Sequence, residues 1–199
     1  MERQIEEKNY SMVLDADIRD FVNKINKFSP KKGTYNIIEI RDSYTKTCKA
    51  FAKDLPKNVK RQTTKIKTSQ KIIPIRHYTK GCKAICQILY IHGGGFVMGD
   101  LESHDGICAD LCNLTGLKIT AVNYRLAPEH PYPAAIEDIK DVYLSLNKIL
   151  PTIVMGDSAG ATLSAILAYQ LKGSKKAFKG QILIYPYLGG NTNQGSYLE

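Results

Sequence analysis

Four short apolar runs, separated by stretches with helical periodicity, constrain the fold of this chain more than any other feature. The runs lie at residues 85–91, 118–122, 152–155 and 181–185. Runs of this length with few polar positions are typical of strands that are covered on both faces. Helical spacing of apolar side chains fills the intervals, at residues 103–114, 133–149 and 159–172. Strands that alternate with helices indicate right-handed crossovers, so the predicted fold class is α/β with a mainly parallel sheet and flanking helices.

The first third of the chain follows a different pattern. Residues 11–28 place apolar side chains on one helical face, and residues 34–62 are polar and weakly periodic, as in a second helical piece. Two strands are then predicted at residues 64–68 and 71–77, the first with the alternation of a half-solvated antiparallel pair. The expected division is into a helical segment at residues 1–62 and an α/β domain at residues 63–199.

Composition limits the classes of function. The chain has 199 residues, of which 43% are hydrophobic, and this suits one domain with an ordinary core. No apolar run is long enough to span a bilayer, and the first eight residues alternate in charge without an apolar stretch. We therefore expect a cytoplasmic protein without a membrane span. The five cysteines are odd in number and lack the spacing of zinc knuckles, so neither a disulfide framework nor a metal is predicted.

Positive charge is concentrated in the N-terminal part of the chain. Residues 1–83 hold 20 Lys and Arg against 9 Asp and Glu, whereas residues 84–199 hold 8 against 10. A basic region of this kind is compatible with nucleic-acid binding. However, the lysines are scattered among Thr, Asn and Ser, and no nucleic-acid motif accompanies them. The pattern favours a solvated lysine-rich face and no nucleic-acid partner.

The sequence Gly-Asp-Ser-Ala-Gly joins the third apolar run directly to a helical stretch. A strand that turns at once into a helix strains the backbone of Ser158 and exposes its hydroxyl at the carboxyl end of the sheet. The helix N-terminus then favours developing negative charge. Gly156 and Gly160 allow the backbones to approach, and Asp157 completes the motif. A tight turn with a capping serine is the alternative, but the strand and helix on either side favour a nucleophile.

The sequence His-Gly-Gly-Gly-Phe follows the first apolar run. Successive glycines leave backbone N–H groups unshielded, and such donors stabilise an oxyanion, with the loss of one costing about 10²–10³-fold in turnover. A flexible turn or a phosphate loop is the alternative, but no Lys-Ser/Thr follows as a phosphate loop requires. We predict oxyanion donors at Gly93 and Gly94, with the N–H of Ala159 as the third. His92 and Gly95 are expected to support this loop.

A proline-rich loop, Asn-Tyr-Arg-Leu-Ala-Pro-Glu-His-Pro-Tyr-Pro-Ala, follows the second apolar run. Three prolines among polar groups are typical of a rigid, ordered loop. Glu129 and His130 suggest a catalytic pair at first sight. We favour a structural network instead, in which Arg125 pairs with Asp138 or Glu137.

These three motifs, at these intervals, resemble the hormone-sensitive-lipase family of α/β-hydrolases, and bacterial acetyl esterases and carboxylesterases in particular. The resemblance covers roughly residues 63–199. It implies an α/β-hydrolase fold and hydrolysis of small acyl esters through an acyl-enzyme on Ser158. It also implies no metal or organic cofactor, and a cap over the acyl pocket formed by the N-terminal helices.

The catalytic acid and base follow the serine in this fold, in the chain order Ser…Asp/Glu…His. The 41 residues after Ser158 include no Asp or His, and the only carboxylate side chain among them is Glu199. None of the four histidines is expected at the end of a late strand facing the serine. We therefore expect a C-terminally truncated portion of the domain that has negligible turnover alone, with a second polypeptide as one means of completing it. The alternatives are a non-catalytic small-molecule binder and, on weaker grounds, an amide hydrolase.

Overall fold

A six-stranded sheet forms the centre of the computed structural model, which describes residues 15–29, 36–81, 84–146 and 150–189. The strands are β1 (Lys60–Lys67), β2 (Ile72–Thr79), β3 (Gln87–Ile91), β4 (Lys118–Val122), β5 (Thr152–Asp157) and β6 (Gly180–Ile184). Their order across the sheet is β1-β2-β4-β3-β5-β6. The β4–β3, β3–β5 and β5–β6 pairs are parallel, whereas β1–β2 and β2–β4 are antiparallel. The α/β prediction is therefore confirmed, with an antiparallel pair added at one edge.

The register of the central strands places their carboxyl ends side by side. Ile91, the last residue of β3, lies opposite Val122 of β4 and Gly156 of β5. Because these strands are parallel, the loops that follow them all leave the sheet at the carboxyl ends of the strands. The segments that follow β3, β4 and β5 are the glycine loop (residues 92–98), the proline-rich loop (residues 123–134) and the serine motif around Ser158.

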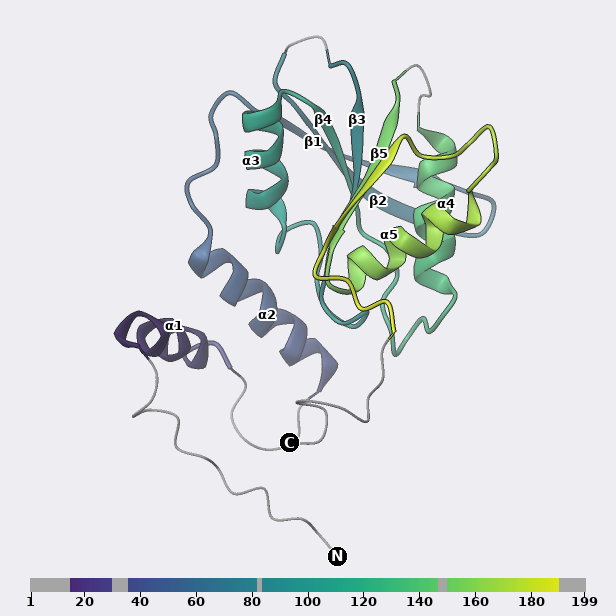
Figure 1. Cartoon of the computed structure of the whole chain (residues 1–199). Coiled ribbons are helices and arrows are strands. Elements are labelled where there is room, and N and C mark those ends of the chain that lie inside the picture. Colours follow the sequence, from purple (N-terminus) through teal and green to yellow (C-terminus); the bar gives the residue numbers. More distant parts are fainter. Residues whose placement is uncertain (1–14, 30–35, 82–83, 147–149, 190–199) are drawn as a thin grey trace, which may run out of the picture.

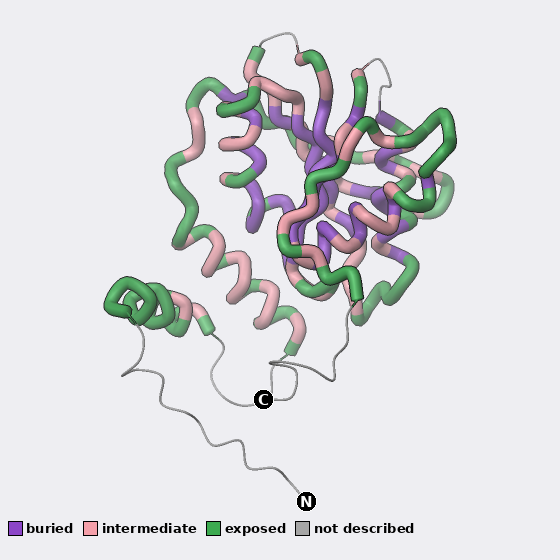
Figure 2. The backbone as a smooth tube through the Cα atoms, in the orientation of Figure 1, coloured by how far each residue is buried: buried purple, intermediate pink, exposed green. Residues whose placement is uncertain are grey.

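Helices cover both faces of this sheet. Helix α3 (Asp105–Thr115) lies on one face, and α4 (Ala134–Ser145) and α5 (Ala159–Gln170) lie on the other (Figure 1). Each face has its own core: one cluster includes Cys108 and Tyr78, and the other includes Ile139 and Leu167. All five residues of β3 are buried between the two cores, and Figure 2 shows the buried centre of the sheet. Burial on both faces explains why the central strands are continuous apolar runs.

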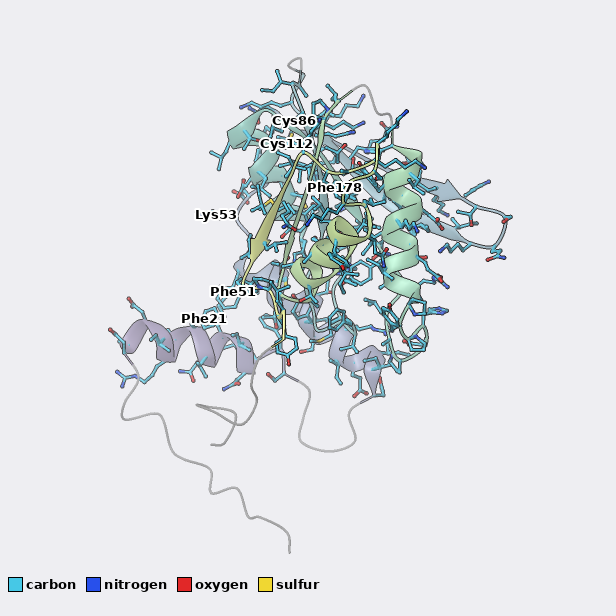
Figure 3. All side chains as sticks on the ribbon, turned by 45° about the vertical axis from the view of Figure 1, so that its right-hand side comes forward. Phe21, Phe51, Lys53, Cys86, Cys112 and Phe178 are labelled. Carbon is cyan, nitrogen blue, oxygen red and sulfur yellow. The ribbon has the colours of Figure 1, made fainter. Side chains whose placement is uncertain are left out.

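The N-terminal helices lie outside these layers (Figure 1). They are α1 (Ala16–Asn26) and α2 (Ile37–Phe51), and neither contains a buried residue. Phe21 of α1 faces Phe51 at the end of α2, with their ring centroids 4.8 Å apart (Figure 3). Residues 11–14 of the predicted first helix lie outside the described residues. The sheet begins at Lys60, slightly before the division expected at residues 62 and 63.

Strand β6 forms one edge of the sheet, and no strand among the described residues pairs with its outer side. Ile182 is 43% exposed, and Tyr185 and Leu188, which follow the strand, are more exposed still. A groove between β6 and α5 is lined by residues that include Tyr169, Phe178 and Leu188. An exposed strand edge beside apolar side chains is a surface suited to strand pairing. Over the ranges that the structure describes, no helix has both the length and the apolar character needed to cross a membrane.

Candidate active site

Ser158 occupies the junction between β5, which ends at Asp157, and α5, which begins at Ala159. Its φ of 49° and ψ of −121° place a non-glycine residue at a positive φ that L side chains rarely adopt. The Ser158 N–H donates to the carbonyl of Ile184 at 2.9 Å, and the Thr162 N–H donates to the carbonyl of Ser158 at 3.1 Å. The strained conformation is therefore held from both sides, by β6 and by the first turn of α5.

Two glycines allow the start of α5 to lie directly against the end of β3. A Cβ atom on Gly160 would be 2.1 Å from the carbonyl oxygen of Ile91 and 2.4 Å from that of His92. A Cβ atom on Gly156 would be 2.6 Å from the backbone of Gly160. Each distance is well inside van der Waals contact, so only glycine fits. This close approach brings the glycine loop after β3 beside Ser158.

Asp157 is a buried acceptor that joins the serine motif to the glycine loop. Its carboxylate accepts from the Tyr90 hydroxyl at 2.9 Å and from the Gly93 N–H at 3.1 Å, and His104 Nε2 lies 3.4 Å away. Burial on its own raises the pKa of this carboxyl, but His104, Tyr90 and Gly93 outweigh it and hold the pKa below its ordinary value. The ionised carboxylate therefore fixes the start of the glycine loop, a role that the sequence motif alone does not reveal.

Of the three glycines in the glycine loop, one has a bonded N–H group and two have N–H groups without an acceptor among the described residues. Gly93 differs from our expectation, because its N–H donates to Asp157 rather than facing open space. Within the described parts of the chain, the N–H groups of Gly94 and Gly95 have no acceptor, and neither does that of Ala159 at the start of α5. The N–H groups without an acceptor in the residues that the structure describes are therefore those of Gly94, Gly95 and Ala159.

His92 holds the glycine loop through main-chain contacts. Its Nδ1 lies 2.8 Å from the carbonyl oxygen of Gly93, and its ring stacks on Tyr124 with a centroid separation of 4.2 Å. The Tyr124 hydroxyl in turn donates to the carbonyl of His92 at 2.8 Å. Burial lowers the pKa of His92 to about 4, so the ring is neutral near pH 7. Because a carbonyl accepts from Nδ1, the proton is on that nitrogen and the loop gains a fixed support.

The other histidines lie elsewhere. His77 Nδ1 is 3.0 Å from the Thr120 hydroxyl on β4, His104 precedes α3 and faces Asp157, and His130 is exposed in the proline-rich loop. In the ranges that the structure describes, no histidine is hydrogen bonded to Ser158. The described residues also contain no cluster of three or more His, Cys, Asp or Glu side chains that could hold a metal.

The proline-rich loop is fixed by an ion-pair network. Arg125 donates from Nη2 and Nε to Asp138 at 2.9 and 3.0 Å, and its Nη2 lies 3.4 Å from Glu137. Lys71 Nζ pairs with the same Asp138 carboxylate at 2.7 Å. The structural network expected for Arg125 is confirmed, with a lysine that the sequence pattern did not indicate. Glu129 belongs to a separate pair, with a partner on α2 that is described below.

A sheet with this strand order, and a strained serine between its fifth strand and the next helix, defines the α/β-hydrolase class of fold. The family described as the alpha/beta hydrolase fold matches residues 88–198, more than half of the chain, and the chain belongs to this family.

Two of the relatives are named as an esterase and an ester hydrolase. The esterase LipI of Mycobacterium tuberculosis is 44% identical over an alignment of 113 positions, and the match covers 50% of this chain and 34% of that protein. The ethyl acetate hydrolase of Pseudomonas putida is 39% identical over an alignment of 109 positions, and that match also covers 50% of this chain and 34% of that protein. The chain thus spans about a third of the length of these curated relatives.

Solved structures agree with this assignment. An esterase from Pyrobaculum calidifontis is 31% identical with a TM-score of 0.75, covering 88% of this chain and 59% of that chain. An esterase from the bacterial hormone-sensitive lipase family, 23% identical with a TM-score of 0.71 over 87% of this chain and 58% of that chain, shares the fold. The resemblance drawn from the three motifs is therefore confirmed, and the family is one of carboxylic-ester hydrolases.

Proposed function

We propose that this chain supplies the nucleophile and the oxyanion site of a carboxylic-ester hydrolase that acts on small acyl esters. The observation that carries the proposal is the strained Ser158, which lies where a glycine loop with free N–H groups comes against the start of α5. A positive φ at a non-glycine residue costs stability and persists where function requires it. The names of the relatives, an esterase and an ethyl acetate hydrolase, support the same substrate class.

In the proposed reaction, a general base takes the proton of the Ser158 hydroxyl while its Oγ attacks the carbonyl carbon of the ester and forms a tetrahedral intermediate. Its oxyanion accepts hydrogen bonds from Ala159, Gly94 and Gly95, which replaces Gly93 because the Gly93 N–H already donates to Asp157. The C–O bond then breaks, the alcohol leaves with a proton, and an acyl-enzyme remains on the serine. Water attacks this ester in the same site and releases the carboxylic acid.

A general base has to come from outside the described residues, because none of their histidines contacts Ser158. A serine hydroxyl without a base is a poor nucleophile at neutral pH. Loss of a member of the catalytic triad leaves only about 10³–10⁴-fold acceleration over water. We propose that the acid and the base lie on additional sequence, in one chain or in a second polypeptide that docks at β6, and that residues 1–199 alone have negligible turnover.

The helices of residues 1–62 are proposed to form a cap. Helix α2 crosses near the loops at the carboxyl ends of the central strands (Figure 1), and its Arg41 side chain contacts the glycine loop at Val97 and the proline-rich loop at Ala127. Cap helices exclude water from the site and shape the acyl pocket.

The test compares hydrolysis of p-nitrophenyl acetate by three preparations. They are the 199-residue chain, the chain with the polypeptide encoded after codon 199, and the same pair carrying Ser158→Ala. We expect turnover only in the second preparation. Ordinary enzyme rates in the first would contradict the need for an external base.

No turnover in any preparation, together with binding of a short-chain ester that leaves it intact, would favour a non-catalytic small-molecule binder. The absence of a histidine beside Ser158 among the described residues is the observation that favours this second function.

A further inference from the structure

Arg41, on α2, joins three segments that are far apart in the sequence. Its Nε donates to the carbonyl of Val97 at 2.8 Å, and its Nη2 donates to the carbonyl of Ala127 at 2.9 Å. Its Nη1 and Nη2 also bind the two carboxylate oxygens of Glu129 at 2.8 and 2.6 Å. One side chain therefore connects the helix to the glycine loop and to the proline-rich loop.

These contacts lie close to the proposed oxyanion donors. The N–H groups of Val97 and Met98 donate to the carbonyl of Gly94, at 3.1 and 2.8 Å. The Ala127 N–H donates to the carbonyl of Phe96 at 3.0 Å, which ties the two loops together. Phe96 has a φ of 66°, so the loop is held in a conformation that it would not adopt alone. From α2, the Arg41 side chain donates to the carbonyls of Val97 and Ala127, next to these main-chain bonds.

The chemistry of the contact requires arginine. A planar guanidinium can bind a carboxylate with two parallel bonds and still direct Nε and a second Nη proton at carbonyl groups. A lysine ammonium is a point charge that cannot reach these acceptors together. Arg41 lowers the pKa of Glu129 to about 2, so the carboxylate remains ionised at neutral pH.

We propose that Arg41 is a positioning residue that sets the conformation of the glycine loop, residues 92–98, from helix α2. Its significance for catalysis rests on the proposed function, because the loop is taken to hold the oxyanion. The pair also lines a cavity of about 370 Å³ together with Thr45, Asp100 and Tyr124. A molecule in this cavity would therefore contact the residue proposed to position the glycine loop.

The first experiment measures amide hydrogen exchange in the 199-residue chain and its variants. Arg41→Lys removes the carbonyl contacts, and Lys46→Ala is the control because Lys46 is on the same helix in an exposed pair with Asp42. Hydrogen bonds to a charged group contribute about 1.5–3 kcal/mol, so exchange at Val97 and Met98 should rise by roughly tenfold or more in the first variant alone. Unchanged loop exchange, or an equal rise throughout β3 and β5, would overturn the proposal.

Glu129→Gln provides a second variant should Arg41→Lys fail to fold. It removes the charge pair but keeps both carbonyl acceptors of Arg41. Exchange in α2 should rise, and exchange in the glycine loop should rise less than the roughly tenfold predicted for Arg41→Lys. No change in either segment would overturn the proposal.

The second experiment separates this inference from the proposed function. Trifluoroacetophenone forms a tetrahedral adduct with a nucleophilic serine that ¹⁹F NMR detects, and the adduct needs the oxyanion site but no turnover. It is measured in the chain completed by the polypeptide encoded after codon 199, because the proposed function gives Ser158 no base without that polypeptide. We expect Ser158→Ala to abolish the adduct, Arg41→Lys to weaken it about tenfold, and Lys46→Ala to leave it unchanged. An adduct of full strength in Arg41→Lys would overturn the role of Arg41 and leave the function standing. No adduct in the completed chain without substitutions would count against Ser158, while the exchange experiment would still decide on Arg41.

Discussion

Substitution of Gly160 by alanine tests whether the close approach of α5 to β3 requires glycine. The added Cβ atom would lie 2.1 Å from the carbonyl oxygen of Ile91 and 2.4 Å from that of His92. Both oxygens belong to the main chain at the end of β3, which is held between β4 and β5. Neither can rotate away as a side chain would, so α5 or the sheet has to move.

The magnitude follows from two opposing contributions. Overpacking of a well-packed interior costs about 1–3 kcal/mol, and main-chain neighbours place this site at the upper end. Alanine in a helix gains about 1 kcal/mol over glycine. The net loss in the free energy of unfolding is therefore about 2 kcal/mol. For a chain of this size, this corresponds to a fall in Tm of about 4–8 °C.

Urea unfolding followed by far-UV circular dichroism measures this loss. Gly106→Ala is the control, because Gly106 is also helical but its added Cβ would meet nothing closer than the Ala52 side chain at 3.9 Å. We expect the control to be more stable than the unaltered chain by about 0.5–1 kcal/mol. A Gly160→Ala chain that is as stable as the control would refute the reasoning.

Two further predictions concern ion pairs. Asp138→Asn leaves Lys71 and Arg125 without their buried partner, so the free energy of unfolding should fall by about 3–5 kcal/mol in urea titrations. Asp141→Asn removes a more exposed partner of the same lysine and should cost at most about 1 kcal/mol, and equal losses would argue against a buried network. The arginine partner of Glu129 lowers the pKa of its carboxyl from 4.5 to about 2. The stability that this ion pair contributes is therefore fully present above about pH 4.5 and is lost as the pH falls towards 2. The protection factors of the α2 amides, which correct for the intrinsic exchange rate at each pH, should fall over that window in the unaltered chain and show no such transition in Glu129→Gln.

The secondary structure of the sheet could be predicted because burial on both faces leaves a local signature. Strand β4 has the predicted bounds, and β5 and β6 differ from the predicted runs by one or two residues at an end. The last two residues of β5, Gly156 and Asp157, were not predicted, because a buried aspartate interrupts the apolar run that indicates a strand. The role of the Asp157 carboxylate as an acceptor depends on Tyr90 and His104, which come from distant parts of the sequence.

The pair formed by Arg41 and Glu129 shows why other parts of the site were not predicted. Its members are separated by 88 positions, and neither belongs to a periodic pattern. Arg125 and Asp138 are only 13 positions apart, at the two ends of one loop and helix, and their pairing was within reach of sequence reasoning. The hydrogen bond from the Gly93 N–H could not be predicted either. Nothing in the sequence distinguishes the three successive glycines before the position of the Asp157 carboxylate is known.

The position of β3 in the sheet has a consequence for the order of events during synthesis. β3 is the first of the parallel strands to leave the ribosome, but its two neighbours, β4 and β5, follow about 30 and 65 residues later. The edge of β3 that pairs with β5 must therefore stay open until residue 157 has been made, about 35 residues after β4 can cover the other edge. Ser158 is the next residue, so the proposed nucleophile leaves the ribosome directly behind the strand that closes the centre of the sheet.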